Sequence, residues 1–275
     1  MSSDVIIVIV LAIIQGLTEF LPVSSSGHLV IAGALLGSRD PAGAGSIMFE
    51  IAVHVGTLGA VVTVYRKKIV ALVRTAAGWI FPALRINETF KDDSLYIGWI
   101  FLGSIPAGLV GILFKDRIEG MFDSPGIVSG LLIVTGVMLL LSKGRGGDSS
   151  LTWKTVILIG IAQAVAIFPG CSRSGWTIAV ALLMGIGFER GAEFSFMLSL
   201  PAILGALLLE LVDGGVIFST SSMILLVIGT VTAFVAGLFA LKLLIYILKK
   251  GSFYRFAWYL IPAGLGLLAY FMIIV

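Results

Sequence analysis

Six stretches of the chain are mostly apolar over about 20 residues, the length that a helix needs to cross a lipid bilayer. They cover residues 46–65, 95–114, 125–142, 190–212, 219–248 and 254–275. Each stretch predicts a transmembrane helix. A further apolar stretch, 69–84, is short and contains Arg74, so we expect it to lie at the membrane interface.

Two more apolar regions are interrupted in the middle by polar and turn-forming residues. The first covers 5–36 and breaks at a Pro-Ser-Gly cluster, and the second covers 155–188 and breaks at a Pro-Gly-Ser-Arg cluster. Irregular backbone at membrane depth is tolerated only where protein or a wet cavity surrounds it. Each region therefore predicts a re-entrant hairpin of two half-length helices.

The two interrupted regions resemble each other. QGLTEFLPVSSSGH at 15–28 aligns without gaps with QAVAIFPGCSRSGW at 163–176, and five of the fourteen positions are identical. We therefore predict one membrane domain, 1–275, built as a duplication with halves near 1–147 and 148–275. Each half holds one hairpin and three spans. Because three is odd, the second half must be inverted, an arrangement that brings broken helices together near the bilayer midplane.

The composition agrees with a membrane protein. Hydrophobic residues make up 59% of the 275 residues and charged residues only 12%, with a mean hydropathy of +1.12. A soluble domain carries about 25% charged residues, so a cytosolic enzyme and a disordered regulator are excluded. One cysteine excludes a disulfide framework, and no long basic run indicates nucleic-acid binding. The prediction is an all-α integral membrane protein with an inverted-topology repeat, about six transmembrane helices and two re-entrant hairpins.

Lysine and arginine residues are divided unevenly between the two sides of this topology. Thirteen fall on one side, and the other side has Arg39, Lys115 and Arg117. Positively charged loops are retained in the cytoplasm, so we expect the first side to be cytoplasmic and both termini to face outward. Lys242 lies near the end of a predicted span, and we expect its ammonium group to reach toward the headgroups.

The first loop gathers polar and small residues at a depth where ionisable groups are costly. They are Gln15, Glu19, Ser24, Ser25, Ser26, Gly27 and His28. Gln15 and Glu19 share one helix face, and the serines stand at the start of the next helix. Such a helix start, with free N–H groups and hydroxyls, binds anions such as phosphate, and His28 is suited to acid–base chemistry. The alternative is structural: the serines only cap the helix, and Glu19 pairs with His28.

The second loop is cationic where the first is acidic. Its polar and small residues include Gly170, Ser172, Arg173, Ser174, Gly175 and Thr177. Arg173 supplies a forked, permanently charged donor that matches a phosphoryl group. An arginine at midmembrane needs an anionic partner, which is Glu19, a substrate phosphate, or both. A purely structural Arg–Glu pair is the alternative here.

The differences between the aligned loops favour catalysis over simple binding. Opposite Glu19, Ser25 and His28, the second loop has an isoleucine, an arginine and a tryptophan. One loop thus carries the acid–base and nucleophilic groups, and the other carries the cation. His54 either lines the pocket or pairs with a glutamate one turn earlier, and Ser195 is expected to cap a helix start.

At these loops the chain resembles the undecaprenyl-diphosphate phosphatase family of the bacitracin-resistance type. The family motif of an acidic residue or Gln, three residues and Glu, followed by PVSSxGH, stands here as QGLTE at 15–19 and PVSSSGH at 22–28. The second family motif, PGxSRSxxT, is complete at 169–177. The resemblance covers nearly the whole chain. One departure is His54, where the family pattern has glutamine.

The resemblance implies an enzyme that converts a C55 polyprenyl diphosphate to its monophosphate outside the cytoplasmic membrane. This reaction recycles the lipid carrier of cell-wall synthesis and confers bacitracin resistance. The resemblance also implies a divalent cation, Mg²⁺ or Ca²⁺, held by Glu19 and Gln15. It leaves a homodimer open. An alternative from another class is a secondary transporter or flippase of the lipid phosphate, because inverted repeats are typical of alternating access.

The expected catalytic residues are Glu19, Ser25, His28 and Arg173. Arg173 clamps the diphosphate together with the loop amides, Ser25 attacks the terminal phosphorus, and His28 takes the proton. In the other version of this mechanism, His28 activates water directly and Ser25 is only a ligand. The residues expected to bind phosphate are Ser24, Ser26, Gly27, Gly170, Ser172, Ser174, Gly175 and Thr177.

Overall fold

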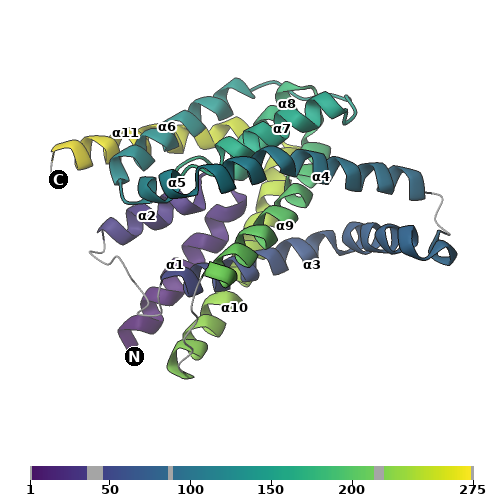
Figure 1. Ribbon diagram of the computed structural model, residues 1–275. Helices are drawn as coiled ribbons and strands as arrows, with labels where there is room; N and C mark the ends of the chain where they lie inside the picture. Colours follow the sequence, from purple (N-terminus) through teal and green to yellow (C-terminus); the bar gives the residue numbers. More distant parts are fainter. Residues whose placement is uncertain (1, 36–45, 86–88, 214–219, 274–275) are drawn as a thin grey trace.

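A computed structural model describes residues 2–35, 46–85, 89–213 and 220–273, and helices make up nearly all of them (Figure 1). The prediction of an all-α protein is therefore confirmed. The two interrupted regions each fold as a hairpin of two packed helices. These are α1 (Ser2–Phe20) with α2 (Ser25–Leu35), and α7 (Trp153–Val165) with α8 (Arg173–Leu183).

Five helices of the described chain are long and apolar enough to cross a membrane, and a bent pair makes a sixth span if it is counted as one. Four of the five are α3 (Ser46–Ile80), α4 (Phe90–Leu113), α9 (Phe188–Asp213) and α10 (Thr220–Lys249), and the fifth, Phe253–Ile273, joins a 3₁₀ turn to α11 (Ala257–Ile273). The bent pair is α5 (Lys115–Phe122) with α6 (Pro125–Leu141), which meet at 101°. Short 3₁₀ turns stand before α4 and α11, at Pro82–Leu84 and Phe253–Phe256. The predicted six spans agree with this count.

The stretch predicted at the membrane interface, 69–84, follows a kink at Tyr65, whose φ of −101° and ψ of 18° are not helical, and residues 69–80 form the arm of α3 beyond that kink. Its position at the interface stays a prediction. The helix α5 was not foreseen. Its three apolar side chains, Ile118, Met121 and Phe122, share one helix face, but eight residues are too few and too polar to be predicted as a span.

The two hairpins pack against the opposite halves of the chain in a reciprocal way. α1 runs along α10, whereas α7 runs along α4, and α6 packs on α11 (Figure 1). Glycines allow the close approach: a Cβ on Gly16 would lie 2.7 Å from the Ala233 carbonyl, and one on Gly160 would lie 2.5 Å from the Gly103 carbonyl. Each half thus buries the first hairpin helix of the other, as an interdigitated inverted repeat requires. The boundary near residue 147 stays a prediction.

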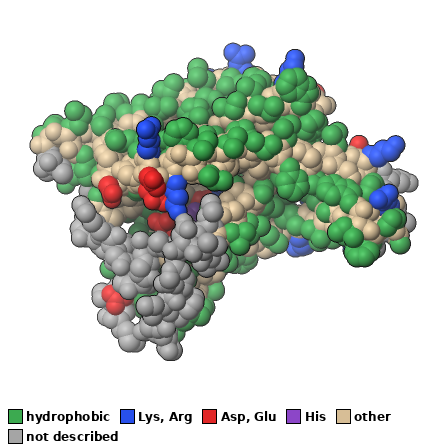
Figure 2. All heavy atoms as spheres, viewed as in Figure 1, with side chains coloured by type: hydrophobic (Ala, Val, Ile, Leu, Met, Phe, Trp, Pro, Cys, Tyr) green, Lys and Arg blue, Asp and Glu red, His purple; other side chains and the backbone are tan. Residues whose placement is uncertain are grey.

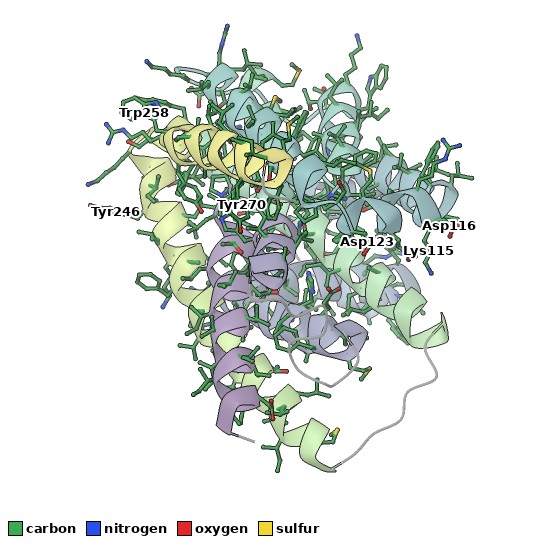
Figure 3. The ribbon with its side chains drawn as sticks, turned by 90° about the vertical axis from the view of Figure 1, so that its left-hand side faces the viewer. Lys115, Asp116, Asp123, Tyr246, Trp258 and Tyr270 are labelled. Atoms are coloured by element: carbon green, nitrogen blue, oxygen red, sulfur yellow. The ribbon has the colours of Figure 1, made fainter. Side chains whose placement is uncertain are left out.

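The outer surface is suited to lipid. Figure 2 shows a largely hydrophobic face whose charged side chains gather in separate groups, one of them over α5. In the view of Figure 3, Lys115, Asp116 and Asp123 of this region lie at one edge, and Tyr246 and Trp258 lie at the opposite edge. The two aromatic side chains are 55% and 70% exposed, as residues of an interfacial aromatic belt are. The chain is a multi-pass membrane protein.

Candidate active site

The two hairpin loops meet tip to tip through matching contacts. A Cβ on Gly27 would lie 3.1 Å from Gly170 Cα, and a Cβ on Gly175 would lie 3.4 Å from Pro22 Cβ. Gly27 aligns with Gly175, and Pro22 aligns with Gly170. The two contacts are therefore equivalent under the repeat, and the loops that the sequence singled out are brought together.

A serine stands before the second helix of each hairpin in the same way. Ser24 Oγ accepts the Gly27 N–H at 3.2 Å, and Ser172 Oγ accepts the Gly175 N–H at 3.1 Å. The hydroxyl two residues further along lies 3.3 Å from each of these oxygens. Ser24 also holds a left-handed backbone, with φ of 72°. These two serines cap their helices, and their role in phosphate binding stays a prediction.

Glu19, at the last turn of α1, is the centre of the junction. Its side chain is only 6% exposed, and its Oε1 accepts a hydrogen bond from Arg173 Nη2 of the opposite loop. Its Oε2 accepts from Ser25 Oγ at 2.6 Å and from Gln15 Nε2 at 3.0 Å. His54 Nε2 of α3 lies 4.0 Å from the same oxygen. Three of the predicted residues, Arg173, Ser25 and Gln15, therefore share the buried carboxylate of Glu19.

Two polar atoms of this cluster are buried without a hydrogen-bond partner among the described residues. They are Arg173 Nη1, which is a donor, and Gln15 Oε1, which is an acceptor. A buried polar atom without a partner is costly, and in native structures such atoms commonly mark a site that a ligand, water or ion completes. Among the described residues, the junction thus offers a ligand one hydrogen-bond donor, Arg173 Nη1, and one acceptor, Gln15 Oε1.

His28 lies in the first turn of α2 but does not join the Glu19 cluster. Its Nδ1 is 2.8 Å from the Ser24 carbonyl, so this nitrogen carries the proton, and its Nε2 accepts from Tyr259 Oη at 2.7 Å. Within the described chain the ring has no hydrogen bond with Ser25 or Glu19. The structural alternative in which His28 pairs with Glu19 is therefore wrong, and the role of His28 as a base stays a prediction.

Thr135 of α6 anchors the second loop, and sequence reasoning did not find it. Its hydroxyl donates to the Gly170 carbonyl at 3.0 Å and accepts from Ser172 N and from Trp176 Nε1, both at 3.3 Å. Trp176 aligns with His28, so this position binds α6 from one hairpin and α11 from the other. A single threonine in an apolar span carries no pattern that could have indicated the contact.

The hydroxyls of α8 mostly hold the loop in place. Thr177 Oγ1 donates to the Arg173 carbonyl and lies 2.6 Å from Ser195 Oγ of α9, so it braces the first turn of α8 rather than facing Glu19. Ser195, expected as a helix cap, instead makes this contact between helices. Ser174 Oγ donates to the Leu21 carbonyl across the junction at 3.3 Å.

The residues at the junction fit a divalent cation that a substrate helps to bind. The described chain has no group of three His, Cys, Asp or Glu side chains that could hold a metal by itself. One carboxylate, Glu19, and the unpaired amide oxygen of Gln15 are available. Mg²⁺ is commonly bound through one or two carboxylates together with substrate phosphates, which is the donor set that remains here.

Comparison with known proteins identifies the family of this chain. Residues 8–266 match the family model of the bacitracin resistance protein BacA. The undecaprenyl-diphosphatase of Desulforapulum autotrophicum is 41% identical over 270 residues, which cover 94% of this chain and 95% of the relative. Those of Bacteroides thetaiotaomicron and Treponema denticola are 40% and 38% identical, each over 266 residues; the alignments cover 94% and 96% of this chain and 96% of each relative. The chain belongs to the bacitracin resistance protein BacA family.

Proposed function

We propose that the protein is an undecaprenyl-diphosphate phosphatase, which hydrolyses the lipid diphosphate to its monophosphate and inorganic phosphate. The observation that carries this proposal is the buried junction of Arg173, Glu19 and Ser25, in which Arg173 Nη1 has no partner. A phosphoryl oxygen satisfies that donor, and the serine hydroxyl lies on the same carboxylate as the arginine. The relatives that align over nearly the whole chain are named undecaprenyl-diphosphatase.

The chemistry then uses groups from both loops. Arg173 and the N–H groups of the α8 start bind the terminal phosphoryl group and stabilise its developing charge. Ser25 Oγ attacks the terminal phosphorus while its proton passes to Glu19 Oε2, the oxygen 2.6 Å away. The bond from phosphorus to the bridging oxygen breaks, and the polyprenyl monophosphate leaves. Water then cleaves the phosphoserine: its proton goes to His28 Nε2, which gives up the hydrogen bond from Tyr259, and the proton on Glu19 returns to Ser25 as inorganic phosphate leaves.

A divalent cation, Mg²⁺ or Ca²⁺, supplies charge neutralisation on the diphosphate when it is bound. Glu19 and Gln15 Oε1 are the groups that would hold it. The support is the unpaired oxygen of Gln15 beside the buried carboxylate. We also propose that the site opens to the outer side of the cytoplasmic membrane, because most lysine and arginine residues fall in the loops of the other side.

The test is phosphate release by the purified protein in detergent, with a C15 or C55 polyprenyl diphosphate and Mg²⁺. Hydrolysis needs no second compartment, so a transporter or flippase releases nothing in this assay. We expect release that stops on chelation and returns with added cation. Absence of release from intact, folded protein would refute the proposal.

The two steps of the mechanism are separated by trapping. With substrate labelled in the terminal phosphate, acid quenching of His28→Ala should show accumulated phosphoserine, whereas Ser25→Ala should show neither label nor release. Near-normal turnover by Ser25→Ala removes Ser25 as the nucleophile and leaves water activated by His28.

A further inference from the structure

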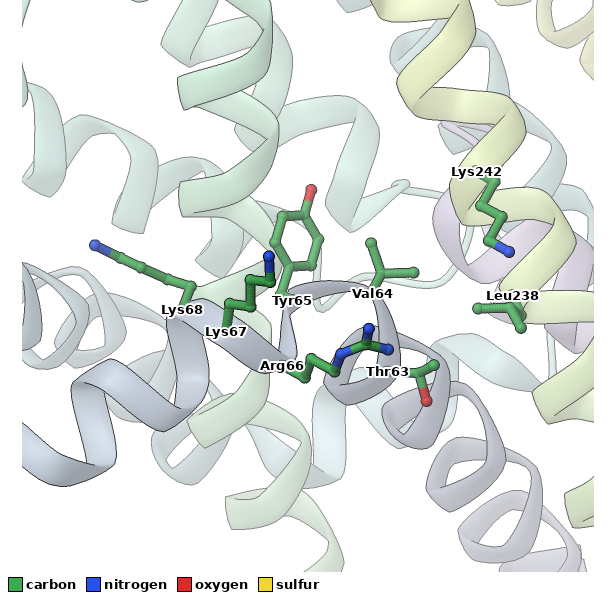
Figure 4. A pocket seen from close by; sticks show the side chains of 8 residues that line it. All are labelled: Thr63, Val64, Tyr65, Arg66, Lys67, Lys68, Leu238 and Lys242. Atoms are coloured by element: carbon green, nitrogen blue, oxygen red, sulfur yellow. The ribbon is translucent and has the colours of Figure 1, made fainter.

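A cavity of about 430 Å³ lies between the bend of α3 and α10, apart from the loop junction (Figure 4). Its lining includes Tyr65, Arg66 and Lys67 of α3 and Lys242 of α10. From His54, which faces Glu19, to Arg66 is twelve residues of helix, or about 18 Å. The cavity is therefore distinct from the active site, and nothing in the proposed reaction uses it.

Three cations of this cavity have no carboxylate partner in the described part of the chain. Arg66, Lys67 and Lys242 take part in none of its ion pairs, whereas Lys68 beside them is paired with Asp93 at 3.0 Å.

The nearest carboxylates on α9 are engaged elsewhere. Glu189 pairs with Lys249 at 3.2 Å, and Glu193 accepts a hydrogen bond from Tyr96 at 3.4 Å. Neither carboxylate forms an ion pair with Arg66, Lys67 or Lys242 in the described chain, so these three cations remain available to a ligand.

The surroundings of the cavity are apolar and exposed. Val62 and Val70 on α3 are 43% and 47% exposed, and Val235 and Phe239 on α10 are 60% and 61% exposed. On a membrane protein these side chains contact acyl chains. A ligand with a negatively charged head and apolar tails matches both the cations of the cavity and the surface around it.

We propose that this cavity, the α3–α10 pocket, binds the phosphate headgroup of an anionic membrane lipid. Basic pockets between transmembrane helices on the cytoplasmic side bind such headgroups, and this pocket carries residues of the positively charged side. Arg66 supplies a forked donor for phosphate oxygens. Lys242, which the sequence predicts to reach toward the headgroups, lines the cavity from α10 opposite the residues of α3 (Figure 4). One phosphate would thus be held from two elements.

The proposal is tested on the full-length purified protein by thermal unfolding in detergent and by native mass spectrometry. The added probes are short-chain phosphatidylglycerol, short-chain phosphatidylcholine and inorganic phosphate. A ligand at 100 times its dissociation constant stabilises the folded state enough to raise the melting temperature by about 5 °C. We expect this shift with phosphatidylglycerol alone, together with retained lipid in the mass spectrum.

The variant Arg66→Gln/Lys242→Gln should lose the shift and bind phosphatidylglycerol at least tenfold more weakly. The control, Arg74→Gln/Lys91→Gln, removes the same charge from exposed positions outside the pocket and should keep the shift. Phosphate release in detergent should stay within twofold of wild type in both. If the double variant unfolds during purification, Lys242→Gln alone is measured by mass spectrometry and should show the same loss.

Two results would overturn the proposal. One is equal stabilisation of wild type and Arg66→Gln/Lys242→Gln by phosphatidylglycerol, which means that the lipid acts elsewhere. The other is an equal shift with inorganic phosphate, which means that the pocket takes a free anion and not a lipid.

Discussion

Removal of the Glu19 charge should destabilise the protein as well as inactivate it. In Glu19→Gln, Arg173 keeps a positive charge on a side chain only 19% exposed and loses the carboxylate that it binds. Breaking a buried ion pair from one side costs about 3–5 kcal/mol. For a chain of this size, that loss corresponds to a fall in melting temperature on the order of 10 °C. Glu19→Gln/Arg173→Gln, which leaves no uncompensated charge, should recover most of the fall while staying inactive.

The assay is thermal unfolding in one detergent, with phosphate release measured on the same preparations. Glu189→Gln is the matched control, because Glu189 pairs with Lys249 at the surface, where both side chains are more than half exposed. Exposed pairs contribute about 0–1 kcal/mol, so this variant should unfold within about 3 °C of wild type. Two results would refute the argument that Glu19 neutralises a buried Arg173. One is a melting temperature of Glu19→Gln equal to that of the control, and the other is a double variant that is less stable than Glu19→Gln.

Three further changes probe the same junction. Arg173→Lys should lower phosphate release at least a hundredfold in the detergent assay, since an ammonium group cannot bond Glu19 and phosphate through two fixed nitrogens; a fall of less than tenfold contradicts the clamp. Gly27→Ala should lower both the melting temperature and the activity, because the new Cβ would lie 3.1 Å from the backbone of the opposite loop. Gly126→Ala should change neither, because a Cβ there meets nothing within 4 Å. His54→Gln should keep kcat within about threefold, since glutamine keeps a polar group in place of His54 Nε2, which lies 4.0 Å from Glu19 Oε2, and His54→Leu should lower kcat about tenfold or more; equal kcat values place His54 outside the reaction.

The hairpins and spans could be predicted because lipid imposes a simple rule on backbone. A helix must be about 20 apolar residues long to cross, and polar interruptions at that depth require protein around them. Both hairpins follow from this rule. The α5 helix does not, because its eight residues are too few and too polar to form a span.

The chemistry of the junction could be predicted only because the two loops align with each other in sequence. The pairing of Arg173 with Glu19 joins residues 154 positions apart, and the aligned loops were the only signal for it. Thr135 and Tyr259 bind the same aligned position of the two loops, through Trp176 and His28. Each of them is one polar residue in an apolar helix, and only the packed structure identifies its partner.

The divergence of the two loops follows from the way the repeat brings them together. Residue 167 aligns with Glu19, so two identical loops would place a second carboxylate in the second loop, which meets the first loop at the junction. Two carboxylates held close together away from water repel each other, and without a cation neither of them has a partner. Ile167 removes the second carboxylate, and Arg173, aligned with Ser25, replaces a second hydroxyl by the cation that Glu19 requires. The same two changes that balance the charge of the duplicated junction also leave it with the one nucleophile and the one phosphate clamp that the proposed mechanism uses.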